Sequence, residues 1–253
     1  MSTDERPTKS LPGGSRSSKS SAEPGSAEFR QYRFRPPAGA TDMLLFRHGE
    51  SAPARLDAPA PTVDGQADPA LDPRGRQEAE LVADRFADEE ISAIYVTPLR
   101  RTAQTAAPLA QRTGLAPRVE PDLREVHLGD WEGAEFHQRI AQRDPLISEM
   151  GREQRWDMLP GAEPVEALHK RVRVAIERLA AAHPDERIAV FTHGGILATI
   201  VHLATGCAPF AFLGADNGSL THLVVTDERW VVRRFNDTGH LQSDLDRPVQ
   251  PLI

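Results

Sequence analysis

Leu-Leu-Phe-Arg-His-Gly-Glu-Ser, residues 44–51, is the stretch that decides the fold. An apolar run from Met43 ends abruptly at Arg47 and His48, which predicts a buried strand over 43–47. In open α/β sheets, ligands bind outside the carboxyl ends of the strands. The stretch therefore predicts that Arg47 and His48 are presented at a ligand-binding edge of a sheet.

Predicted strands and helices alternate along the rest of the chain. Short apolar runs at 91–96 and 188–191 are typical of buried strands, and 220–226 with 230–235 alternate as an antiparallel hairpin at one sheet edge. Helical spacing of apolar residues separates these strands. The predicted helices are 73–89, a helix opened by Thr97-Pro98 and ended by Gly114, one with Val165 to Leu179 on its buried face, and 196–203. This order predicts an α/β protein, a three-layer α/β/α sandwich with a mostly parallel central sheet.

The bulk composition excludes several classes of protein. Hydrophobic residues make up 39% and charged residues 26% of the 253-residue chain, which is ordinary for a globular protein. The single cysteine, Cys207, permits no internal disulfide and no cysteine-based metal site, so we expect a cytoplasmic location. No apolar run approaches the roughly 20 residues that span a bilayer, and the N-terminus lacks a signal-peptide core. The net charge of -7 argues against a nucleic-acid partner.

Residues 1–40 differ in composition from the rest of the chain. The first 28 residues hold eight serines, three prolines and three glycines, with almost no large apolar residue. Such a segment cannot bury enough surface to offset its ordering entropy. We therefore expect a disordered tail over 1–40, one domain over 41–243 and a C-terminal tail over 244–253. A homodimer is compatible with the sequence, which leaves the oligomeric state open.

Two segments repeat one design, in which an apolar strand is followed by histidine and then glycine. His48 and Gly49 follow one strand, and His193 and Gly194 follow another. A lone histidine there would more often be structural, but two of them, accompanied by arginines, favour a reactive site. Without a Cβ, the glycines would let the backbone approach a ligand and adopt positive φ. The helix that begins after Gly195 would also point free N–H groups at an anion.

The residue types around these histidines suit a phosphomonoester. Arg47 and Arg101 offer planar donor forks that match phosphate oxygens. A neutral His48 could attack phosphorus and form a phosphohistidine, and His193 could stabilise the charge that shifts onto the phosphoryl oxygens. Glu125 could protonate the leaving oxygen and then activate water. The arginines and second histidine supply the countercharge, so we expect no metal and no cofactor.

Two of these roles have alternatives that spacing alone leaves open. Glu125 could instead be a surface carboxylate paired with Arg124. Arg100 competes with Arg101, and because neighbours on a helix do not face the same way, we expect only one of them to enter the site. The other histidines lack a tight ligand spacing and are not expected to bind metal.

Five segments, taken in order, resemble the motifs of the histidine phosphatase superfamily, whose fold is phosphoglycerate-mutase-like. They are 45–51, 71–79, 97–106, 123–133 and 191–195. The resemblance covers about residues 42 to 240 and implies that Arg101, rather than Arg100, is the second arginine. Members often carry an asparagine just after the first motif, where 52–54 reads Ala-Pro-Ala, so we expect that phosphate contact either to be lost or to be replaced by Ser51 or the backbone. Before the long helix, 160–164 reads Pro-Gly-Ala-Glu-Pro, where the family commonly has two glycines and a serine.

The resemblance implies a metal-independent phosphomonoesterase that hydrolyses a small phosphorylated metabolite. One alternative is a cofactor-dependent phosphoglycerate mutase-type phosphotransferase. Such mutases carry a longer insertion between proton donor and second histidine, and the 67 residues between Glu125 and His193 favour the phosphatase. A second alternative is a non-catalytic binding module, which would be expected to lose the nucleophile or an arginine. The substrate, expected to be selected by 52–70 and 134–161, is not determined by the sequence.

Overall fold

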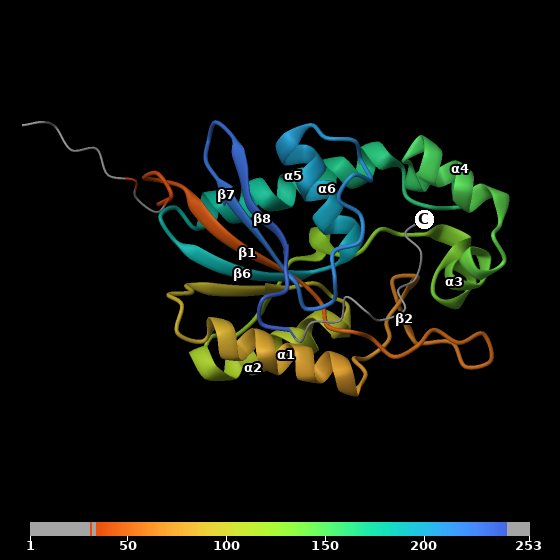
Figure 1. Ribbon diagram of the computed structural model, residues 1–253, viewed down its shortest axis with the longest axis horizontal. Coiled ribbons are helices and arrows are strands. Elements are labelled where there is room, and N and C mark those ends of the chain that lie inside the picture. The colour runs from red at the N-terminus through yellow and green to blue at the C-terminus, as the bar shows by residue number, and fades with distance from the viewer. Residues whose placement is uncertain (1–30, 32–33, 242–253) are drawn as a thin grey trace, which may run out of the picture. The chain divides into compact units, whose positions relative to one another are not determined.

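The computed structural model describes residues 31 and 34–241, and a mixed six-stranded sheet forms its centre (Figure 1). The strand order is β5-β4-β6-β1-β7-β8. The strands are β1 (Thr41–Arg47), β4 (Ala93–Val96), β5 (Arg118–Val119), β6 (Arg187–Thr192), β7 (Leu220–Val225) and β8 (Trp230–Asp237). The first four in this order pair in parallel, whereas β7 pairs antiparallel with both β1 and β8. The predicted mostly parallel sheet with an antiparallel edge hairpin is confirmed.

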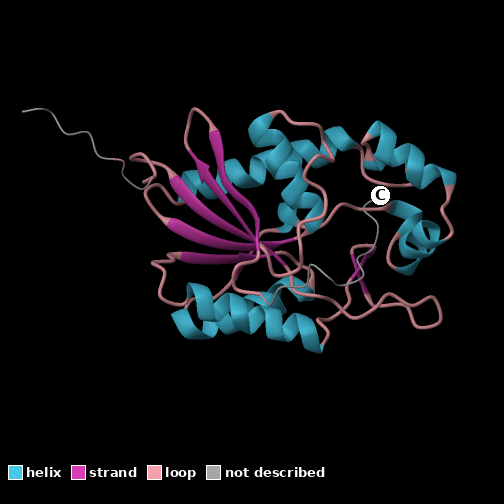
Figure 2. Cartoon of the chain, in the orientation of Figure 1, coloured by secondary structure: helices cyan, strands magenta, loops and turns pink. Residues whose placement is uncertain are grey.

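Helices cover both faces of this sheet (Figure 2). On one side lie α1 (Pro73–Phe86) and α2 (Arg100–Thr113), and on the other α5 (Val165–Ala182) and α6 (Gly194–Thr205). Successive side chains of a strand point to opposite faces. Accordingly, Met43 and Leu45 of β1 join the core under α5 and α6, while Leu44 and Phe46 join the core under α1 and α2. The predicted three-layer sandwich is confirmed.

Local sequence signals explain where the helices begin and end. The Asp72 carboxylate accepts a hydrogen bond from the Gly75 N–H, and a proline follows Asp72 at the first helical position of α1. Gly114 ends α2 with φ 71°, which glycine adopts without strain. The helix α6 begins at Gly194, two residues earlier than predicted, so His193 itself is its N-cap. The predicted tails 1–40 and 244–253 lie, apart from residues 31 and 34–40, outside the described residues.

The two segments expected to select the substrate contain regular structure of their own. Residues 134–161 form α3 (Ala134–Ala141), α4 (Pro145–Glu153) and a 3-10 turn at Trp156–Met158, which extend beyond the end of the sheet (Figure 1). Within the predicted loop 52–70, a small hairpin pairs β2 (Thr62–Val63) with β3 (Gln66–Ala67). Its turn is Asp64-Gly65, with φ 48° and 82°. Asp-Gly is a strong hairpin signal, so this element could have been predicted from the sequence.

The turn after β1 crosses directly against the first turn of α1. A Cβ on Gly49 would lie 2.5 Å from the Gly75 carbonyl oxygen, and a Cβ on Gly75 would lie 2.0 Å from the Glu50 carbonyl oxygen. Ser51 then forms an isolated antiparallel bridge with Leu71. These contacts direct the chain away from β1 just after His48. Gly49 does not have positive φ, so the expectation of positive φ is wrong there. Glycine is required at this position because two backbones are in close contact.

We expect Gly75→Ala to lower the free energy of unfolding by about 1–3 kcal/mol or more, because a new Cβ would overlap a backbone carbonyl that cannot rotate away. Urea denaturation measures this change. Gln77→Ala, at an exposed position of the same helix, is the matched control and should stay within about 0.5 kcal/mol of the parent. Equal stabilities for the two variants would contradict the proposed backbone contact.

Candidate active site

The two histidines predicted to work together lie side by side at the carboxyl ends of β1 and β6. These strands are parallel neighbours in which Arg47 pairs with Thr192, the residue before His193. The His48 N–H extends the pairing by donating to the Thr192 carbonyl at 2.9 Å. The ring centroids of His48 and His193 are 5.1 Å apart, with an interplanar angle of 63°. Sheet register alone therefore brings together residues that are far apart in the sequence.

Hydrogen bonds define which nitrogen of His48 carries a proton. Its Nδ1 lies 2.8 Å from the Gly49 carbonyl oxygen, which can only accept, so Nδ1 donates. Its Nε2 accepts from Arg101 Nε at 3.1 Å. Burial, followed by the charges of Arg101 and Arg47, lowers the pKa of His48 well below its ordinary value. The ring is therefore neutral near pH 7, with its lone pair on Nε2.

His193 is fully buried and contacts the residue that follows β4, the strand on the side of β6 opposite to β1. Its Nε2 lies 2.9 Å from the hydroxyl of Thr97, just before α2. Its Nδ1 is buried without a hydrogen-bond partner. Burial, then the charge of Arg101, lowers the pKa of His193 well below its ordinary value. When Thr97 donates to Nε2, the hydrogen of the neutral ring resides on Nδ1, the atom left free to donate.

The two predicted arginines converge on these rings. Arg47 donates to the Ala215 carbonyl, and its Nε is buried without a partner. Arg101 donates from Nη1 to the Ala67 carbonyl at 3.0 Å, besides its contact with His48. Burial lowers the pKa of both guanidinium groups, opposed first by the charge of Glu125, but arginine stays charged in proteins.

The choice between Arg100 and Arg101 is settled by where each side chain points. Arg100 turns outward, where its Nε lies 2.8 Å from an Asp68 carboxylate oxygen and its backbone N–H donates to the other oxygen. Arg101 is 7% exposed and faces His48. Of these two neighbours, the structure brings Arg101 to His48 and places Arg100 against Asp68.

Glu125 reaches the site from an irregular segment rather than pairing at the surface. Its Oε1 accepts from the Val126 N–H at 2.9 Å and its Oε2 from the Gly195 N–H at 3.3 Å. Burial raises its pKa, opposed by these hydrogen bonds and by Arg101 and Arg47. Arg124 instead lies 3.6 Å from Asp64, so the alternative pairing of Glu125 with Arg124 is wrong.

The glycines after His193 serve close packing. A Cβ on Gly195 would lie 2.7 Å from Glu125 Oε1, and a Cβ on Gly194 would lie 3.4 Å from Arg47 Nε. Neither glycine has positive φ, so that expectation is wrong for this motif as well. The Gly195 N–H is also not free for an anion, because Glu125 accepts its hydrogen bond.

Several residues that shape the site were not identified from the sequence. The Asn217 side chain donates to the His48 carbonyl at 2.8 Å, and the Gly49 N–H donates to the Thr105 hydroxyl at 2.9 Å. Asn217 lies 169 residues from His48, and its Asn-Gly dipeptide signals only a turn. An asparagine thus supports the backbone of the His48 turn, although 52–54 supplies none. The role of Ser51 as a phosphate ligand stays a prediction.

The arrangement is suited to an anion. Arg47 Nε and His193 Nδ1 are buried polar atoms without partners, and leaving such atoms unpaired costs roughly 1–3 kcal/mol each. Two buried guanidinium groups, Arg47 and Arg101, add positive charge in a poorly solvated place, which favours a bound anion. Across residues 34–241, no group of three or more His, Cys, Asp or Glu side chains is arranged to hold a metal ion.

Comparisons with known proteins agree on one family. The chain matches the Histidine phosphatase superfamily (branch 1) over residues 43–238. It is 31% identical over 207 residues to the Metal-independent phosphoserine phosphatase of Arabidopsis thaliana, covering 80% of this chain and 84% of that protein. It is 32% identical over 227 residues to the Glucosyl-3-phosphoglycerate phosphatase of Mycobacterium tuberculosis, covering 80% and 97%.

A solved structure extends this agreement to three dimensions. The native structure of mycobacterial glucosyl-3-phosphoglycerate phosphatase superposes with a TM-score of 0.65 at 26% identity, covering 79% of this chain and all of that one. The family match runs from within β1 to just after β8, so it includes every element that contributes to the site. The chain belongs to the histidine phosphatase superfamily, branch 1.

Proposed function

We propose that this chain is a phosphomonoesterase that transfers the phosphoryl group of a small phosphorylated metabolite first to His48 and then to water. The enzyme class follows from the family and from relatives that are named phosphatases. The observation that carries the residue assignment is the neutral His48 ring, with Nδ1 bonded to the Gly49 carbonyl and the Nε2 lone pair beside Arg101. Such an imidazole is a competent nucleophile at pH 7.

The proposed reaction has two steps that share the same residues. In the first, His48 Nε2 attacks phosphorus, the ester P–O bond breaks, and Glu125 gives its proton to the leaving oxygen. In the second, water attacks phosphorus, Glu125 takes the water's proton, and the P–N bond breaks to return free His48. Arg47, Arg101 and His193 hold the phosphoryl oxygens in both steps, since donors placed before the reaction lower its barrier most.

The environment of Glu125 suits a group that is an acid in one step and a base in the next. Burial raises its pKa, which favours the protonated form needed to release the alcohol. The Val126 and Gly195 N–H groups and the two arginines favour the carboxylate, which is needed to activate water. The opposing influences keep both forms accessible.

The substrate is proposed only as a class. The relatives reported above are named for phosphoserine and for glucosyl-3-phosphoglycerate, both of which are small phosphate monoesters. Within the described part of the chain, no helix is long and apolar enough to cross a membrane. A homodimer, a cytoplasmic location and the lack of a nucleic-acid partner stay predictions.

His48→Ala should lower phosphate release from p-nitrophenyl phosphate by about 10⁴-fold or more, because it removes the nucleophile. Circular dichroism should show an unchanged fold. Mixtures of the parent enzyme with ³²P-labelled substrate, quenched in alkaline SDS, should contain base-stable, acid-labile protein phosphate that the variant lacks. Retained turnover in the variant would rule out His48 as nucleophile, and isomerisation of phosphoglycerate faster than phosphate release would favour a mutase.

Arg101→Ala and Arg100→Ala form a matched pair on one helix. Arg101→Ala should lower kcat/KM about 10²- to 10³-fold, because a buried donor to the transition state is lost. Arg100→Ala should change it less than about fivefold, since the Arg100 side chain does not contact His48 and the backbone N–H of residue 100 still binds Asp68 in the variant. Steady-state assays on both variants check the assignment, and similar losses in the two would overturn it.

The pH profile of kcat/KM should reflect the two shifted groups. The lowered pKa of His48 keeps the nucleophile neutral to a lower pH than usual, so activity should fall only below the ordinary histidine range. The raised pKa of Glu125 means that activity with a poor leaving group should decline as pH rises through that pKa. Glu125→Gln should remove this alkaline limb. Phenyl phosphate is the substrate for both enzymes, so the ionisation of the substrate affects both pH profiles equally. An alkaline limb that is unchanged in Glu125→Gln would show that another group titrates.

A further inference from the structure

The segment that carries Glu125 is not part of a strand or α-helix that would pair its backbone N–H and carbonyl groups. A 3-10 turn spans Pro121–Leu123, another begins at Gly129, and residues 124–128 between them are irregular. Leu123 and Val126 are nevertheless buried, so their polar backbone neighbours need partners from elsewhere in the protein. Side chains from three different elements supply them.

Arg171 of α5 supplies most of these partners. Its Nη1 donates to the Asp122 carbonyl at 2.6 Å and to the Arg124 carbonyl at 2.8 Å, and its Nη2 donates to the Glu125 carbonyl at 3.1 Å. Its Nε and Nη2 also bind both carboxylate oxygens of Glu163, at 2.9 and 2.6 Å. All five N–H groups of the guanidinium are thereby used.

Glu163 contacts the part of the segment that follows Glu125 in the sequence. Its Oε1 accepts from the His127 N–H at 2.9 Å, and its own backbone N–H donates to the His127 carbonyl at 3.0 Å. The Arg171 and Glu163 side chains are only 14% and 17% exposed, so solvent screens this pair little. The pair therefore holds the backbone on both sides of Glu125.

Two further side chains complete the support. Gln66 Nε2 donates to the Glu125 carbonyl at 2.8 Å and to the Val126 carbonyl at 3.3 Å, and the Thr192 hydroxyl donates to the Leu123 carbonyl at 2.8 Å. The Glu125 carbonyl thus accepts from both Gln66 and Arg171. These contacts matter for the carboxyl group because its Oε1 bonds to the next backbone N–H, that of Val126.

We propose that Arg171, with Glu163, is a positioning residue that holds Glu125 where it can transfer a proton. This inference rests on the proposed function, in which Glu125 is the acid and base. The support is rigid, because Leu168 and Val172 of the same helix are buried in the core. Displacement of a reacting group by about 1 Å can cost about 10²-fold in rate, so loss of this support should be visible in proton transfer.

A lysine at position 171 keeps the charge but cannot reproduce five donors in a fixed plane. We expect Arg171→Lys to lower kcat/KM for phenyl phosphate, whose leaving group needs a proton, about 10- to 100-fold. For p-nitrophenyl phosphate, whose leaving group needs little protonation, the loss should be less than about threefold. Glu163→Gln should show the same pattern with smaller losses. Equal losses with the two substrates would overturn the proposal.

A double variant tests whether Arg171 acts through Glu125. Glu125→Gln already removes proton transfer, so adding Arg171→Lys should lower kcat/KM for phenyl phosphate by less than about a further twofold. If Arg171 merely stabilised the fold, its substitution would lower kcat/KM by the same factor with Glu125 or with Gln at position 125, and that result would refute the proposal.

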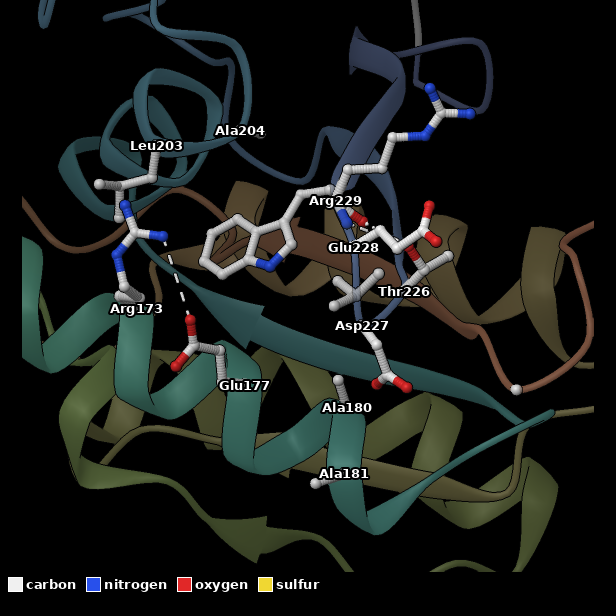
Figure 3. Close-up of a pocket in the computed structure, with 13 residues that line it drawn as sticks. Arg173, Glu177, Ala180, Ala181, Leu203, Ala204, Thr226, Asp227, Glu228 and Arg229 are labelled. Carbon is white, nitrogen blue, oxygen red and sulfur yellow. Dashed lines mark hydrogen bonds and ion pairs between the residues drawn. The ribbon is translucent and has the colours of Figure 1, made fainter.

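Arg173→Lys is the matched control on the same helix. Arg173 lies 4.0 Å from Glu177 in a separate hollow of about 510 Å³, bordered by α5, α6 and the turn between β7 and β8 (Figure 3). Among the described residues, Arg173 has an ion pair with Glu177 and lies over the Trp230 ring, and neither residue belongs to 122–127. We expect this variant to keep both activities of the parent enzyme within about twofold.

Hydrogen–deuterium exchange separates the inference from the proposed function. Arg171→Lys should speed exchange in peptides that span 122–127 and leave those of β1 and β6 unchanged, whatever the activity. Unchanged exchange at 122–127 would overturn the positioning role. Faster exchange there, combined with a parent enzyme that releases no phosphate from any monoester, would refute the proposed function and with it the catalytic purpose of the contact.

Discussion

The parallel pairing of β1 with β6 is the constraint on which the site depends. Both strands are buried between two helical layers, so their register cannot slip without moving apolar side chains to the wrong face. That register places His48 and His193 at one edge with their rings in contact. The other site residues are then added around this fixed pair, Arg101 by α2 and Glu125 by the segment before the 3-10 turn at Gly129.

Burial sets the protonation states that the chemistry needs. It disfavours every charged form, which lowers the pKa of both histidines and raises that of Glu125. Arg47 and Arg101 cannot respond by losing a proton, so their charge persists in a poorly solvated place. In the proposed reaction, a phosphoryl group would supply the compensating negative charge. Burial therefore accounts together for a neutral His48, for a Glu125 that holds its proton more tightly, and for two cationic side chains that favour an anion.

Close backbone packing and side-chain hydrogen bonds replace regular structure at this edge. Gly49 and Gly195 allow contacts that a Cβ would block, with Gly75 in the first case and with Glu125 in the second. Arg171 and Gln66 satisfy backbone carbonyls that have no strand partner. These interactions join parts of the chain that are far apart in the sequence. They explain how an irregular segment can hold a carboxyl group at a defined place.

The α/β sandwich could be predicted from the sequence, because buried strands and amphipathic helices have distinct periodicities that short windows reveal. The sequence also predicted that Arg47, His48, Arg101, Glu125 and His193 meet at one place, since each lies in a local motif, and the structure brings them together. It could not identify Asn217, which contacts the His48 carbonyl from 169 residues away, nor the role of Arg171. The tertiary structure was needed to reveal those contacts. It was also needed to show that Gly49 is required by close backbone packing rather than by positive φ. Both features depend on which backbones cross in space, and periodicity along the chain carries no such information.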